Sequence, residues 1–252
     1  MLHYSFIEYI YLFLSGIVAS TIDSIAGSGG IITVPVLLSI GAPPIVALGT
    51  NKLQEPIGQF IATWRFIKTG ELRWKLIIYI CGFSIAGVSA GVLSVQLIHS
   101  GYLQRLLPIL LMLALIYIVF SRKLFVYQTK PKMPFILFSI IFGSSIGFYN
   151  GFFGPGTGLL WTTSFIYFLS MNLRLATMYA KPANLCCNII ALVWFIIAGH
   201  VLYKAAFVLG LGGIVGSLIG AKVVIEKGTR LIKPVFIVMM LLLTTNLLLK
   251  AF

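Results

Sequence analysis

Long apolar stretches alternate with short polar turns along the whole chain. Most apolar runs are about 20 residues long, the length at which a helix crosses the hydrocarbon core of a bilayer. Two are only about a dozen residues long, which is typical of a half-helix or a re-entrant element. The pattern predicts an all-α membrane protein whose apolar segments lie at roughly 5–26, 30–41, 45–67, 76–97, 102–120, 135–153, 158–170, 174–198, 204–225 and 232–250.

Glycines stand directly before both short segments. Gly27-Ser28-Gly29-Gly30 precedes the first, and Gly154-Pro155-Gly156-Thr157-Gly158 precedes the second. The one substantial polar linker, at 121–134, holds four basic residues and divides the chain almost in half. We therefore expect a first membrane repeat at 1–120, a basic cytoplasmic linker at 121–134, and a second membrane repeat at 135–252.

The two halves align without a gap when the second is moved back by 129 positions. A lysine within an apolar run and a series of glycines then match at one shared offset, which chance apolar matches do not explain. This indicates an internal duplication. The matched pairs include Gly27 with Gly156, Gly29 with Gly158, Lys52 with Lys181, Gly70 with Gly199, Gly87 with Gly216 and Gly91 with Gly220.

Basic residues are distributed differently in equivalent loops of the two halves. The first half holds Lys68, Arg73 and Lys75 after its third segment, where the second half keeps only Lys204. Equivalent loops that differ in this way face opposite sides of the membrane. We therefore predict two inverted-topology repeats of about five segments each, with the linker inside and both termini outside. If the short elements turn back without crossing, the number of full spans falls towards eight.

The composition supports the membrane assignment and excludes several other classes. Hydrophobic residues make up 60% of the chain and charged residues 9%, with a mean hydropathy of +1.06, whereas soluble domains carry about 25% charged residues. The net charge of +13 comes from basic residues between apolar segments, a pattern that sets orientation and does not indicate nucleic acid. The three cysteines show no metal-ligand spacing, so neither a metal nor a cofactor is expected.

Lys52 and Lys181 are the strongest candidates for function. Polar groups inside a membrane are costly and need a reason, and inverted repeats place equivalent residues around a central axis near the midplane. On this interpretation the two lysines hold one anion, and replacing either with alanine abolishes binding. The alternative is that both side chains extend to the headgroup region.

The glycine clusters strengthen the anion hypothesis. A helix that begins within the membrane presents free N–H groups and the positive end of its dipole, and glycine lets the backbone approach a ligand closely. The alternative is that these glycines serve only close helix packing. The predicted substrate-binding set is Gly27, Ser28, Gly29, Gly30, Asn51, Lys52, Gly156, Thr157, Gly158, Lys181 and Asn184.

Asp23 and Glu55 are the two carboxylates predicted to lie within the membrane. Asp23 has structural alternatives, since it could cap the half-helix or pair with Lys52. Either carboxylate could instead bind H⁺ or Na⁺ as the coupling ion. Their repeat equivalents are Phe152 and Asn184, so any coupling role is asymmetric.

Two motifs resemble those of a known family. The stretch from Asp23 to Gly30, with the later run from Ala47 to Gln54, is similar to the first-half motif of the TauE/SafE sulfite exporter family. The run from Gly147 to Gly158, followed by Lys181, is similar to its second-half motif. Asn150 departs from the family pattern, which commonly has an acidic residue there. The resemblance implies a plasma-membrane transporter of sulfur-containing anions.

The sequence therefore predicts a secondary transporter in the bacterial inner membrane. Its expected substrate is a small sulfur-containing anion of the sulfite, thiosulfate or organosulfonate class, moved by alternating access around the central site. One alternative is a passive anion channel on the same scaffold. An intramembrane enzyme is the other, but the predicted segments hold no histidine and no paired carboxylates for such chemistry.

Overall fold

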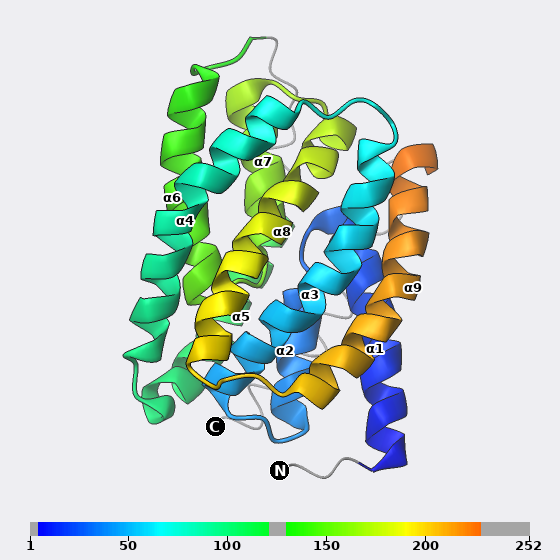
Figure 1. Ribbon diagram of the computed structural model, residues 1–252, viewed down its shortest axis with the longest axis vertical. Coiled ribbons are helices and arrows are strands. Elements are labelled where there is room, and N and C mark those ends of the chain that lie inside the picture. The colour runs from blue at the N-terminus through cyan, green and yellow to red at the C-terminus, as the bar shows by residue number, and fades with distance from the viewer. Residues whose placement is uncertain (1–4, 121–129, 228–252) are drawn as a thin grey trace.

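The computed structural model describes residues 5–120 and 130–227, which form nine helices and no strand (Figure 1). Five of them are long and apolar enough to cross a membrane: α1, α4, α6, α8 and most of α9. The helices are α1 (Phe6–Ala26), α2 (Gly30–Ser39), α3 (Pro44–Ile67), α4 (Trp74–Gln96), α5 (Ser100–Phe120), α6 (Phe135–Phe152), α7 (Thr157–Leu169), α8 (Leu173–Ile197) and α9 (Tyr203–Lys227).

These bounds confirm nine of the ten predicted segments to within about two residues at each end. The tenth, at 232–250, lies outside the described residues. The short segments are short helices, with 10 residues in α2 and 13 in α7. α3 is 24 residues long, but its buried polar residues keep it out of the set of strongly apolar spans.

Glycines in the left-handed conformation produce both helix breaks. Gly27 ends α1 at φ 73°, and Gly156 stands directly before α7 at φ 86°. Only glycine adopts this conformation at little cost, so the chain can stop one helix and start the next within a few residues. The two breaks meet in space, because a Cβ added to Gly27 would lie 2.5 Å from the carbonyl carbon of Gly158.

Two pairs of helices pack closely along their length, α1 against α9 and α4 against α6. Glycines permit this approach. A Cβ on Gly87 would collide with the backbone of Ser144 on α6, and a Cβ on Gly216 would collide with the backbone of Ile17 on α1. Close backbone contact over small residues is the usual way in which helices associate in membranes.

α3 and α8 pack against each other between these two pairs. In Figure 1 α3 rises from the lower end of the molecule, whereas α8 descends from the upper end. The long helices therefore place residues near the middle of α3 and of α8 beside the two glycine breaks.

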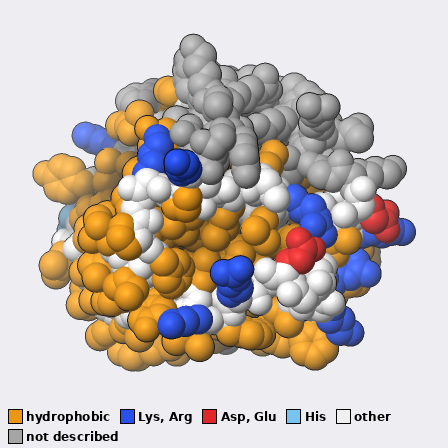
Figure 2. Space-filling model, turned by 90° about the horizontal axis from the view of Figure 1, so that it is seen from above, with side chains coloured by type: hydrophobic (Ala, Val, Ile, Leu, Met, Phe, Trp, Pro, Cys, Tyr) orange, Lys and Arg blue, Asp and Glu red, His pale blue; other side chains and the backbone are white. Residues whose placement is uncertain are grey.

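Basic residues gather at the upper end of the molecule, where α3, α5 and α7 end and where α4, α6 and α8 begin. Figure 2 looks down on this end and shows Lys and Arg side chains spaced among apolar ones. One of them, Arg174, forms an ion pair of 2.8 Å with Glu71. Other described basic residues near this end include Lys68, Arg73, Lys75, Lys130 and Lys132, and α9 also ends here (Figure 1).

Candidate functional site

α3 and α8 each carry a polar stripe directed into the bundle. Residues spaced by three and then four positions lie on one face of a helix, and both stripes have this spacing. Every side chain in them is buried. The stripes consist of Lys52, Glu55 and Gln59 on α3, and Lys181, Asn184 and Asn188 on α8.

Lys52 is held by amide oxygens from two other helices. Its Nζ donates hydrogen bonds to Asn150 Oδ1 at 3.0 Å and to Asn188 Oδ1 at 2.9 Å, and the side chain is 1% exposed. It also lies against the turn before α7, since a Cβ on Gly154 would collide with Nζ. Both hydrogen-bond acceptors are neutral, so the lysine charge has polar partners but no directly bonded carboxylate among the described residues.

Lys181, in contrast, forms an ion pair. Its Nζ donates to Asp23 Oδ2 at 2.9 Å and also to the Asp23 backbone carbonyl. The expected pairing of Asp23 with Lys52 is therefore wrong, because α8 contacts the end of α1 while Lys52 extends towards α6. Asp23 Oδ1 accepts from the N–H of Gly29, directly before α2, at 3.3 Å. α2 itself has no side-chain cap, so the predicted capping role of Asp23 is not confirmed.

Glu55 also lies at the start of α2. Its Oε2 accepts a hydrogen bond from Asn188 Nδ2 at 2.6 Å. Its Oε1 lies beside Gly30, where an added Cβ would be 2.7 Å away. Both intramembrane carboxylates predicted from the sequence therefore face the amino end of α2, where the helix dipole favours negative charge.

Gln59 joins the two lysine sites into one network. Its Nε2 donates to Asp23 Oδ2 at 3.4 Å, and its Oε1 accepts from Asn188 Nδ2 at 3.1 Å. Asn188 in turn accepts from Lys52. Gln59 was missed in the sequence, although it is the repeat equivalent of Asn188 and continues the spacing of the α3 stripe.

Asn150 is the second residue that the sequence analysis did not place in the site. It accepts from Lys52, and its Nδ2 donates to Asn184 Oδ1 at 3.0 Å and to Asn188 Oδ1 at 3.0 Å. The sequence shows that Asn150 departs from the family pattern, but it does not show that Asn150 bonds to Lys52. Asn184 therefore joins the network through Asn150, and its role in substrate binding stays a prediction.

Other predicted residues lie around the edges of this network. Asn51 Oδ1 accepts from Thr33 Oγ1 and from Gln54 Nε2, on the side of α2. Ser28 Oγ donates to the Ala26 carbonyl at 3.4 Å. Thr157 Oγ1 donates to the Gly154 carbonyl, so it orders the turn that touches Lys52.

The two helix starts differ in the charge that faces them. α2 begins beside Asp23 and Glu55. α7 begins at Thr157 without a side-chain cap, and Lys52 lies against the turn before it. A helix amino end together with a lysine attracts an anion, whereas a helix amino end already faced by carboxylates does not. The arrangement therefore favours an anion beside α7.

Membrane-spanning helices with breaks at a buried charged network are typical of secondary transporters. The comparisons with known proteins agree. The chain belongs to the TauE/SafE family of membrane transporters, since the family described as "Sulfite exporter TauE/SafE" matches residues 12–247.

Similar proteins carry the same class name. The chain is 37% identical over 236 residues to "Probable membrane transporter protein" of Haemophilus influenzae, covering 94% of this chain and 92% of the relative. It is 35% identical over 237 residues to "Probable membrane transporter protein YfcA" of Escherichia coli K12, covering 94% and 88%. It is 33% identical to "Probable membrane transporter protein ORF9" of Sinorhizobium, covering 94% and 91%. No solved structure matches the chain.

The buried ion pair gives a stability prediction. Asp23→Asn should lower the free energy of unfolding by about 3–5 kcal/mol, because it leaves Lys181 buried with a neutral partner. Glu71→Gln is the matched control, since the Arg174–Glu71 pair is 38% exposed on both sides and should contribute only about 0–1 kcal/mol. Thermal unfolding in detergent measures both. Equal effects of the two substitutions would contradict a stabilising role for the buried pair.

Proposed function

We propose that the protein is a secondary transporter that moves a small sulfur-containing anion across the bacterial inner membrane by alternating access. The observation that carries the proposal is Lys52, which is buried, bonded to neutral amides, and placed at the turn before α7. A buried cation with no directly bonded carboxylate is costly, and a bound anion would give Lys52 such a partner. Relatives named as transporters agree with this class.

An inverted repeat accounts for the arrangement of the helices. The offset of 129 positions that aligns the sequence relates α1 to α6, α2 to α7, α3 to α8 and α4 to α9. The same exchange turns the α1–α9 packing into the α6–α4 packing. The basic upper end would then face the cytoplasm, as the positive-inside rule requires. α1 with α2, and α6 with α7, would form re-entrant pairs that enter from opposite sides.

Alternating access follows from this symmetry. One repeat rocking against the other would open the centre first to one side and then to the other. Gln59 and Asn188, which are repeat equivalents, hydrogen-bond to each other at 3.1 Å, so the pseudo-two-fold axis would pass close to them. A rearrangement of the two repeats would change this contact first.

A cavity of 520 Å³ opens at the basic end of the molecule, and none of its lining residues belongs to the central network. Arg73 and Lys75 line it, together with Glu71. Two cations against one carboxylate would attract an anion to this opening.

The placement of the anion distinguishes the two lysines. Lys181 is already neutralised by Asp23, so it would position the network and would not bind the ligand directly. Lys52 and the amino end of α7, at Gly156 and Gly158, would receive the oxygens, since the N–H and the hydroxyl of Thr157 already donate to the Gly154 carbonyl. An oxyanion such as sulfite, thiosulfate or a sulfonate offers several acceptor oxygens to these N–H donors, which is the reason, with the family description, for the proposed substrate class.

Charge balance suggests Glu55 as the coupling residue. The network holds Lys52 and Lys181 against Asp23 and Glu55, which cancel when all four are charged. A bound monoanion would leave an excess negative charge inside the membrane, which is costly. Protonation of Glu55 would remove it. Asp23 is less suited to this role because Lys181 already pairs with it, whereas the hydrogen bond to Glu55 comes from a neutral amide.

The first test replaces the proposed binding charge. Lys52→Gln keeps a hydrogen-bond donor but removes the charge, so it should abolish stabilisation by sulfite, thiosulfate or a sulfonate in thermal unfolding of the purified protein. A ligand at about 100 times its Kd should raise the free energy of unfolding of the wild-type protein by roughly 2.7 kcal/mol. Lys204→Gln, at an exposed lysine of α9, is the control and should respond as wild type. Normal stabilisation of Lys52→Gln would remove the proposed site.

The second test concerns coupling. Glu55→Gln mimics the protonated carboxyl, so it should bind the anion at least as tightly as wild type while losing transport driven by an imposed pH gradient in proteoliposomes. Facilitated exchange of anion should persist, because the binding charge remains. If Glu55→Gln still accumulates the anion against its gradient, Glu55 is not the coupling site. If wild-type protein never accumulates anion, the protein is a passive channel.

A further inference from the structure

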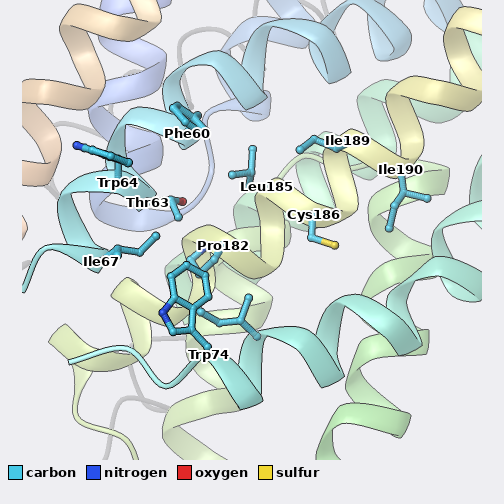
Figure 3. Close-up of a pocket in the computed structure, with 11 residues that line it drawn as sticks. Phe60, Thr63, Trp64, Ile67, Trp74, Pro182, Leu185, Cys186, Ile189 and Ile190 are labelled. Carbon is cyan, nitrogen blue, oxygen red and sulfur yellow. The ribbon is translucent and has the colours of Figure 1, made fainter. Parts of the chain in front are cut away.

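An apolar crevice of 360 Å³ lies on the surface of the membrane domain, between α3 and α8 and beside the start of α4 (Figure 3). Its walls are almost entirely hydrocarbon. Several of them are large apolar side chains exposed at the surface, including Phe60 at 58%, Trp64 and Trp74 at 54% each, and Ile189 at 48%. An exposed apolar crevice of a membrane protein faces lipid tails.

One polar atom interrupts the apolar lining. Thr63 on α3 lines the crevice, and the side chain is 6% exposed. Its Oγ1 has no hydrogen-bond partner in the structure described for this chain. Figure 3 shows this hydroxyl among the side chains that surround the crevice. A buried hydroxyl without a partner costs free energy, so a ligand with an acceptor oxygen at this depth would stabilise it.

The upper end of the crevice carries positive charge. Lys68, directly after α3, places its Nζ 5.1 Å from the ring centre of Trp64. Trp74, the first residue of α4, lies on the opposite wall. Tryptophan and lysine at this position are typical of the boundary between the headgroups and the hydrocarbon, and basic residues there attract anionic headgroups.

The three features follow the order of groups in a glycerophospholipid. Thr63 on α3 lies five residues before Lys68, which directly follows the helix. Five helical residues correspond to about 7.5 Å along the axis. A phosphate beside Lys68 would therefore place the glycerol ester near the Thr63 hydroxyl. Beyond it, Phe60 on α3 and Leu185 and Ile189 on α8 would contact an acyl chain.

We propose that this crevice is a binding site for an anionic glycerophospholipid, with the headgroup at Lys68, an ester oxygen at Thr63, and one acyl chain between α3 and α8. This site is separate from the proposed anion site, and it does not depend on it. Because α3 and α8 carry Lys52 and Lys181, a bound lipid would connect the two helices on which the central network stands.

The test is native mass spectrometry of the purified full-length protein with phosphatidylglycerol or phosphatidylcholine of the same acyl chains. Wild-type protein should retain one phosphatidylglycerol in preference to phosphatidylcholine. Lys68→Gln should weaken phosphatidylglycerol binding about fivefold, the effect expected for one basic residue near an anionic headgroup. Thr63→Val should weaken both lipids by the same factor, because both have the ester oxygen.

Ile189→Trp tests the acyl position. Ile189 is exposed, so the larger side chain fills the crevice without disturbing the core, and lipid retention should fall for both lipids. Lys204→Gln is the matched control, an exposed lysine away from the crevice, and should bind as wild type. Equal retention of the two lipids by wild type, an equal effect of Lys204→Gln and Lys68→Gln, or unchanged retention in Ile189→Trp would each overturn the proposal.

Discussion

The burial of two lysines inside an apolar helix bundle is the constraint on which the rest of the centre depends. Lys52 and Lys181 are each 1% exposed. The effective cost of taking an ion out of water is several kcal/mol, and it is offset only when charges and hydrogen bonds surround the ion. Most polar residues of the α3 and α8 stripes are linked to these lysines by hydrogen bonds, either directly or through Gln59, Asn188 and Asn150.

The network differs between the halves, although the helices that carry it correspond. Lys181 pairs with Asp23 at the end of α1, whereas Lys52 reaches Asn150 near the end of α6. Each lysine therefore extends to the helix that precedes the short helix of the opposite half. A carboxylate stands at one of these places and an amide at the other. This single difference in chemistry leaves Lys181 in a direct ion pair and Lys52 bonded only to neutral amides.

The sequence predicted the bounds of the helices well, but it predicted poorly which polar side chains bond to one another. Apolar length and glycine position depend on local physics, and they placed α2 and α7 to within about two residues. Burial of Lys52 and Lys181 followed from their position inside apolar runs. The partner of Asp23 did not, because the choice between two lysines depends on which helices pack together. Gln59 and Asn150 were missed for the same reason. The sequence does not show which side chain a polar residue of a membrane helix will bond to, because that depends on how the helices pack.

The proposed oxyanion site lies beside Lys52 at the amino end of α7. The most direct measurement is anomalous X-ray diffraction from crystals soaked with selenite, the selenium analogue of sulfite. A selenium peak should lie close enough for the selenite oxygens to hydrogen-bond to Lys52 Nζ and to the backbone N–H groups of Gly156 and Gly158. A peak beside Asp23 and Lys181, or at the surface lysines with the centre empty, would contradict the proposed site.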